Sequence, residues 1–279
     1  MNIPVSVWID YFIELPVEQA ISELSKAGFT QGELSIVHLR QLMERPDPIA
    51  TGAALKATAE SHDYTIPQGH LSFKGGLVEE SALDRLKPEL DLFAAAGIRK
   101  AVIHTNGGDD LPDEKRYEGW VRNLQALSEY VEGTGITLCL ENLNSVHLCR
   151  SADQLKAIIR DAGGKNMGIC LDTGHLHLSR VQKGLQHSHR DFILSAGHLL
   201  QALHITENNG LGDTHQMPYS ARYGIDWKEV MQALRDVNYQ GLFNLELLGE
   251  CNAPMPIKRA KLAFIRAMCD HMLSDEFLL

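Results

Sequence analysis

The chain is 279 residues long, 44% hydrophobic and 22% charged, which fits one globular domain with a sizeable core. Its formal net charge of −10 argues against a uniformly basic surface for nucleic acid, and no run approaches the roughly 20 apolar residues of a membrane span. Five cysteines without a Cys-x-x-Cys pair indicate neither a disulfide framework nor a thiolate zinc site, and the N-terminal segment has no leader pattern. We therefore expect a cytoplasmic protein without a membrane or nucleic-acid partner.

Short runs rich in β-forming residues alternate with longer stretches of helical periodicity, which is typical of repeated βα units around a parallel sheet. The first four strands are expected at residues 5–9, 32–37, 65–71 and 100–104. The helices that follow them are expected at residues 16–27, 49–62, 80–96 and 113–132.

The second half of the chain continues the same alternation. Its strands are expected at residues 138–141, 168–172, 200–204 and 243–246. Its helices are expected at residues 151–162, 189–196, 226–237 and 256–272. Eight βα units with no linker-like break predict a single-domain (β/α)8 TIM barrel over residues 1–279, with an open doubly wound sheet as the alternative.

Six consecutive predicted strands end in a residue that can ligate a metal ion, at the face where barrel enzymes carry their active sites. These residues are His70, His104, Glu141, Asp172, His204 and Glu246. Carboxylates on adjacent strand ends repel one another, and a cation resolves the repulsion. The last four of these residues, two Glu, one Asp and one His, are mostly oxygen ligands with one imidazole, which suits Mn²⁺, Mg²⁺, Co²⁺ or Zn²⁺. The sequence therefore predicts a divalent metal ion whose identity and number stay open.

Two further groups of residues are candidates for the same face. His70 and His104 could ligate a second metal ion, but we favour contact with the substrate. Asp213 and His215 follow the seventh strand at a spacing that lets both point into a site, the alternative being an exposed turn.

Two more side chains are candidates for contact with the substrate. Trp8, in the first strand, could form an apolar wall for a sugar, although core packing is the commoner fate of a tryptophan. Arg222 could contact an anionic group of the substrate, with a simply solvated arginine as the alternative.

These motifs carry a family resemblance. Glu141, the run Asp172-Thr173-Gly174-His175, His204 and Glu246 resemble the xylose isomerase-like TIM-barrel superfamily, which includes sugar phosphate isomerases and epimerases, ketose 3-epimerases and endonuclease IV. The resemblance implies that one metal ion is held by Glu141, Asp172, His204 and Glu246. It also implies that Glu141 and Glu246 shuttle a proton, and that His175 contacts the substrate or a further metal ion.

The predicted function is a divalent-metal-dependent isomerase or epimerase of a small carbohydrate: a sugar, sugar phosphate or keto-sugar derivative. A metal ion on a carbonyl and its neighbouring hydroxyl acidifies the α C–H and stabilises the enediolate. A carboxylate on either face, Glu141 and Glu246, then removes and returns the proton. A dehydratase or lyase on a sugar-derived substrate differs only in the bond that breaks after proton abstraction, so this alternative stays open. Whether the protein forms a homo-oligomer also stays open.

An endonuclease IV-like phosphodiesterase acting on abasic DNA is the second alternative. His175, Asp213 and His215 would supply the additional metal ligands of such an enzyme. However, the loop at 206–210 is acidic, and no basic, aromatic-interleaved stretch is available to grip a DNA backbone. Gly210 stands where ketose 3-epimerases place an arginine, so their detailed specificity does not carry over.

Overall fold

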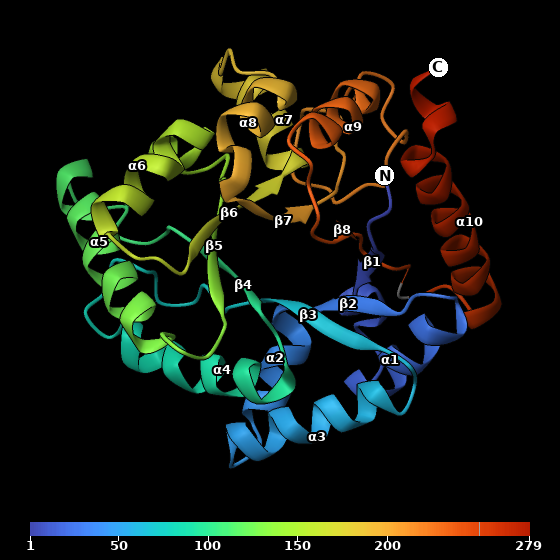
Figure 1. Ribbon diagram of the computed structural model, residues 1–279, viewed down its shortest axis with the longest axis horizontal. Coiled ribbons are helices and arrows are strands. Elements are labelled where there is room, and N and C mark those ends of the chain that lie inside the picture. The colour runs from blue at the N-terminus through green and yellow to red at the C-terminus, as the bar shows by residue number, and fades with distance from the viewer. Residues whose placement is uncertain (251) are drawn as a thin grey trace.

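Eight parallel strands form the centre of the computed structural model, which describes residues 1–250 and 252–279. Neighbouring strands follow the order β7-β6-β5-β4-β3-β2-β1-β8, and helices surround them (Figure 1). The amide of Ile205, just past β7, donates to the carbonyl of Asn244 in β8 at 2.8 Å, which joins the two ends of the sheet. The predicted (β/α)8 barrel is confirmed.

The strands lie close to their expected positions. They are β1 (Val5–Trp8), β2 (Gln31–Leu34), β3 (Thr65–His70), β4 (Lys100–His104), β5 (Thr137–Glu141), β6 (Met167–Asp172), β7 (Leu200–His204) and β8 (Phe243–Leu245). Most strand residues are buried because helices cover the outside of the sheet and side chains fill the inside.

The helices include two that the sequence pattern did not predict. The helices are α1 (Val17–Lys26), α2 (Ile36–Met43), α3 (Pro48–Glu60), α4 (Ala82–Ala96), α5 (Asp113–Tyr130), α6 (Ala152–Ala162), α7 (Thr173–Lys183), α8 (His189–Ala196), α9 (Trp227–Asp236) and α10 (Met255–Leu273). The expected second strand was wrong beyond Leu34, because the chain turns at Ser35 and enters α2. Likewise, α7 begins directly after β6, where the Asp172 side chain accepts a hydrogen bond from the amide of His175.

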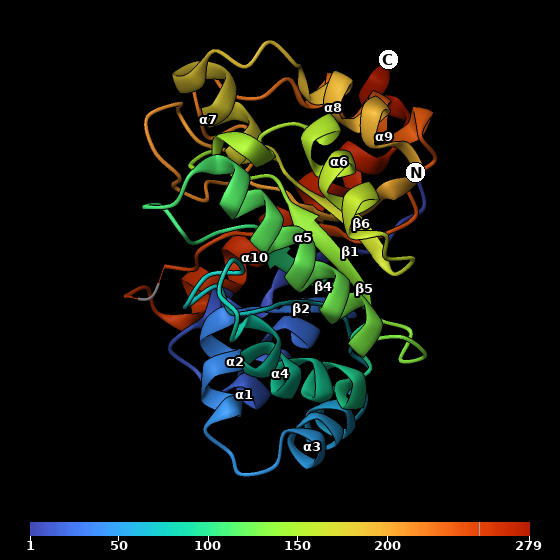
Figure 2. The ribbon, with the colours of Figure 1, turned by 90° about the vertical axis from the view of Figure 1, so that its left-hand side faces the viewer.

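The two ends of the barrel differ in the length of their connections. The loops that follow the strands, among them residues 105–112 and 205–226, project on the left of Figure 2, whereas short helix-to-strand turns lie on the right. Long loops at the carboxyl ends of the strands provide the walls of a site. None of the helices in the described chain is long and apolar enough to cross a membrane.

Candidate active site

The strand tips converge as the barrel predicts. His70, His104, Glu141, Asp172 and His204 are the last residues of β3 to β7, and Glu246 follows β8 directly. The strand register sets His104 beside Glu141 and Asp172 beside His204. Parallel neighbouring strands therefore deliver these side chains to one end of the barrel.

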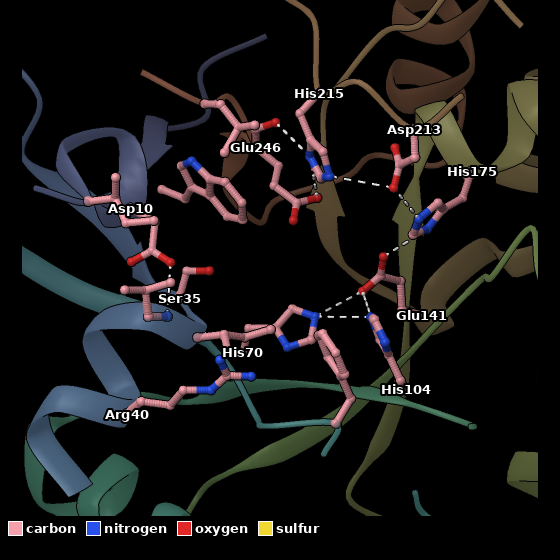
Figure 3. Close-up of a pocket in the computed structure, with 16 residues that line it drawn as sticks. Asp10, Ser35, Arg40, His70, His104, Glu141, His175, Asp213, His215 and Glu246 are labelled. Atoms are coloured by element: carbon pink, nitrogen blue, oxygen red, sulfur yellow. Dashed lines mark hydrogen bonds and ion pairs between the residues drawn. The ribbon is translucent and has the colours of Figure 1, made fainter. Parts of the chain in front are cut away.

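A cavity of about 360 Å³ opens above these tips (Figure 3). The predicted residues that line it are Trp8, His70, His104, Glu141, His175, Asp213, His215 and Glu246. Lining residues that the sequence did not single out include Asp10, Ser35, Arg40 and Phe73. Asp172 and His204 lie beneath the cavity floor and are fully buried.

Glu141, Asp172, His204 and Glu246 form a compact ligand set. Each offers one ligand atom, and these four atoms all lie within 4.8 Å of one another. Among the described residues, Asp172 Oδ2, His204 Nδ1 and Glu246 Oε2 are buried without a hydrogen-bond partner. Buried polar atoms seldom go unsatisfied, and here three of them belong to one cluster of hard donors, so the residues fit a divalent cation.

Glu33, which the sequence analysis missed, orients the histidine of this set. Its carboxylate is fully buried and accepts hydrogen bonds from Gln68 Nε2 at 2.8 Å and from Asn244 Nδ2. The same carboxylate lies 3.1 Å from Nε2 of His204, the contact that would hold a proton on Nε2 when the ring ligates a metal ion through Nδ1. Nδ1 of His204 faces Glu141 and Glu246 at 3.4 and 3.2 Å.

The protonation behaviour of the carboxylates reflects their crowding. Burial raises the pKa of Asp172 to about 8. The charge of His175 acts to lower this pKa, whereas the negative charges of Glu246 and Glu141 raise it further. Burial also acts to raise the pKa of Glu246, but His204 and His215 lower it to about 2. A cation would relieve the repulsion that disfavours a charged Asp172.

Glu141 is surrounded by imidazoles. Its Oε2 lies 3.3 Å from Nε2 of His70 and 3.0 Å from Nε2 of His104, and Oε1 lies 3.1 Å from Nδ1 of His175. Although burial opposes ionisation, His204 and His104 hold the pKa of Glu141 well below its usual range. His70, His104 and Glu141 also form a second group that could hold a metal ion.

The loop after β7 contributes Asp213 and His215, which both line the cavity, although Asp213 is also exposed to solvent. Asp213 Oδ2 lies 3.0 Å from Nε2 of His175 and 3.5 Å from Nε2 of His215. His215 Nδ1 in turn lies 3.7 Å from Oε2 of Glu246. A continuous row of polar side chains therefore joins Glu141 to Glu246 across the cavity (Figure 3).

Aromatic rings form two walls of the cavity. The Trp8 indole stacks on His215 with ring centroids 5.5 Å apart, and its Nε1–H donates to the carbonyl of Leu247 at 2.5 Å. Phe73 stacks on His104 at 5.0 Å. Arg222, in contrast, does not line this cavity, and its guanidinium packs over the ring of Tyr223.

Comparison with known proteins agrees with this geometry. Residues 21–268 match the model of the xylose isomerase-like TIM barrel family, and the chain belongs to that family, as its motifs predicted. A D-psicose 3-epimerase of Agrobacterium fabrum is 26% identical over 249 residues, which cover 81% of this chain and 77% of that protein. A fructoselysine 3-epimerase of Escherichia coli O157:H7 is 25% identical, with 91% of this chain and 94% of that protein covered.

Solved structures share the same fold. The D-psicose 3-epimerase of Clostridium cellulolyticum H10, solved with D-tagatose, superposes with a TM-score of 0.79 at 18% identity. The superposition covers 98% of this chain and 100% of that one. Its strands and helices are therefore arranged as in the present barrel.

Proposed function

We propose that the protein epimerises a ketose or ketose derivative at the carbon beside the carbonyl, using a divalent cation held by Glu141, Asp172, His204 and Glu246. The observation that carries this proposal is the pair of glutamates, Glu141 and Glu246, that reach the cavity from opposite ends of one polar row. The coarser prediction, a sugar isomerase or epimerase, is confirmed by relatives named as sugar 3-epimerases.

The chemistry divides between the cation and the carboxylates. When bound, the cation would polarise the carbonyl and stabilise negative charge on its oxygen. Glu141 and Glu246 both line the cavity, where one carboxylate accepts the proton from the carbon and the other returns a proton to the opposite face. Inversion at that carbon is the result.

His175, Asp213 and His215 hold the two glutamates in place. His175 is fixed on both nitrogens, because Nδ1 lies 3.0 Å from the carbonyl oxygen of Asn142 and Nε2 contacts Asp213. His215 adopts a backbone φ of 45°, a strained conformation for this residue, and stacks on Trp8. These contacts keep the carboxylates oriented toward the substrate.

The same cavity argues against cleavage of DNA. Of the described residues that line it, Arg40 is the one arginine or lysine. A phosphodiester backbone is gripped by several cations, and Arg222 on the loop after β7 lies outside the cavity.

Isotope exchange tests the proposal. Metal-replete protein is incubated with a panel of ketoses in deuterated water, and the products are examined by NMR. We expect deuterium at the carbon beside the carbonyl together with the epimeric sugar. Absence of exchange at every carbon would contradict the proposal, and cleavage of a duplex with an abasic site would favour the nuclease. Repeating the assay with Mn²⁺, Co²⁺, Zn²⁺ and Mg²⁺ identifies the working metal.

A further inference from the structure

Arg40 is an unpaired cation on the wall of the catalytic cavity. Figure 3 shows its side chain reaching from α2 toward the region of His70. Within the described chain, the side chain of Arg40 makes no hydrogen bond or ion pair, although the protein has ten more acidic than basic residues. Arg40 is exposed, and no carboxylate of the described residues competes with a ligand in the cavity for its guanidinium.

The position of Arg40 is fixed by the fold. The carboxylate of Asp10 accepts hydrogen bonds from the amides of Val37 and His38 at 3.0 and 3.3 Å and lies 2.6 Å from Nδ1 of His38. These contacts anchor the first turn of α2. Ile36 and Arg40 are four residues apart, hence on one face of the helix, and both line the cavity.

The acidic side chains of the cavity are already engaged. Asp10 pairs with His38, Glu141 and Glu246 contact imidazoles, and Asp213 contacts His175 and His215. None of these described carboxylates is paired with the guanidinium of Arg40. A neutral sugar has no charge that would require such a group.

Arg40 also borders a second depression of the surface. Ser72, Lys74 and Arg85 line this depression as well. Lys74 is exposed and unpaired in the described chain, and Nε of Arg85 is buried without a partner. Glu44, Glu79 and Glu89 are in this depression too, and burial raises the pKa of Glu89, which favours its neutral form.

We propose that Arg40 binds an anionic group, a phosphate or a carboxylate, at the end of the substrate remote from the reacting carbons. The proposal rests on the sugar epimerase function and narrows its substrate class to an anionic ketose derivative. The planar guanidinium donates two parallel hydrogen bonds to such a group.

The test compares a free ketohexose, its 6-phosphate and the ketohexuronate that carries a carboxylate at the same end. We expect the wild-type enzyme to have a higher kcat/KM for one anionic substrate than for the neutral sugar. In Arg40→Gln the ratio of these two kcat/KM values should fall by about 10–100-fold. Which anionic substrate shows the effect distinguishes phosphate from carboxylate. Arg45→Gln is the matched control, because Arg45 follows α2 and pairs with Glu18 on the surface.

Three outcomes would overturn the proposal: a wild-type enzyme without anionic preference, an unchanged ratio in Arg40→Gln, or loss of the preference in Arg222→Gln alone. If no ketose is turned over, the proposed function fails, and calorimetry then tests Arg40 separately. Weaker binding of the ketohexose 6-phosphate or of the ketohexuronate by metal-loaded Arg40→Gln than by wild type supports the anion site. Equal binding of both anionic compounds by the two proteins rejects it.

Discussion

Two buried carboxylates at the same end of the barrel differ in how their oxygens are satisfied. Glu33 on β2 and Asp172 on β6 are both fully buried. Glu33 contacts three donors, on Gln68, Asn244 and His204, whereas Oδ2 of Asp172 has no hydrogen-bond partner among the described residues. Burial alone therefore does not identify a metal ligand. The unsatisfied Oδ2 of Asp172 indicates a ligand because it also lies within 4.8 Å of ligand atoms of Glu141, His204 and Glu246, where a cation would recover the free energy that an unsatisfied atom costs.

The contrast extends to the two sides of the cavity. On the β1–β2 side, Asp10 and His38 form a closed pair that holds α2. On the β6–β8 side, ligand atoms of Asp172, His204 and Glu246 lie within 4.8 Å of one another, and Oδ2 of Asp172 has no hydrogen-bond partner among the described residues. We infer that the first side shapes the substrate pocket and the second performs the chemistry. Each prediction below separates the two roles.

The largest effect is expected from Glu246→Gln. Removing the proton-accepting carboxylate should lower kcat by about 10²–10⁴-fold while the fold persists. Steady-state kinetics with metal content measured in parallel provide the check. Wild-type rates in a metal-replete variant would remove Glu246 from the acid/base role.

Asp10→Ala should affect stability more than chemistry. Leaving His38 without its buried partner should lower the free energy of unfolding by about 3–5 kcal/mol. Burial acts to lower the pKa of His38, but Asp10 raises it above the ordinary value. The stabilisation is therefore complete below the unfolded-state pKa of about 6.5 and is lost as pH rises through the folded-state value. Denaturant titrations of both proteins should show a difference in the free energy of unfolding that shrinks as the pH rises above about 6.5.

Metal removal should destabilise the protein through the β6–β8 side. Bound metal at 100 times its dissociation constant adds about 2.7 kcal/mol to the free energy of unfolding, and a chelator should remove that amount. Asp172→Asn should lose most of this metal-dependent increment. Elemental analysis of wild type is expected to give one metal ion per chain, and two would assign a second site to His70, His104 and Glu141. An unfolding curve insensitive to chelator would contradict the ligand assignment.

Glu33→Gln should give the smallest effect. Its amide oxygen still accepts a hydrogen bond from His204 but lacks the charge that increases the basicity of the ring, so metal affinity should fall by about 10–100-fold. Metal titration followed by calorimetry measures this change. Unchanged affinity would mean that Glu33 serves packing alone.

The sequence predicted the strand tips well because a strand that ends in a ligating residue is a local pattern. His70, His104, Glu141, Asp172 and His204 all prove to be terminal strand residues. The roles assigned to them remain predictions. The sequence did not predict α2, because its apolar start, Ile36 and Val37, continues the strand pattern without a break.

Missing α2 also meant missing Arg40. Its approach to the cavity depends on the helical turn that sets it beside Ile36. Glu33 was missed for another reason: a glutamate within a short strand carries no sign of whether it faces a histidine from a strand far away in the sequence. That pairing joins residues 171 positions apart and is created by closure of the barrel.

The two oxygens of the Asp172 carboxylate have different surroundings, a combination that few other side chains could provide. Its Oδ1 caps α7 through the amide of His175 at 2.6 Å, while Oδ2 remains available to a cation. Serine could cap the helix but would bring no charge, asparagine could cap it without neutralising a metal ion, and glutamate would carry its carboxylate past the helix end. Under the proposed function, the requirements of folding and of metal binding both select aspartate at position 172, so a substitution survey should find little tolerance there.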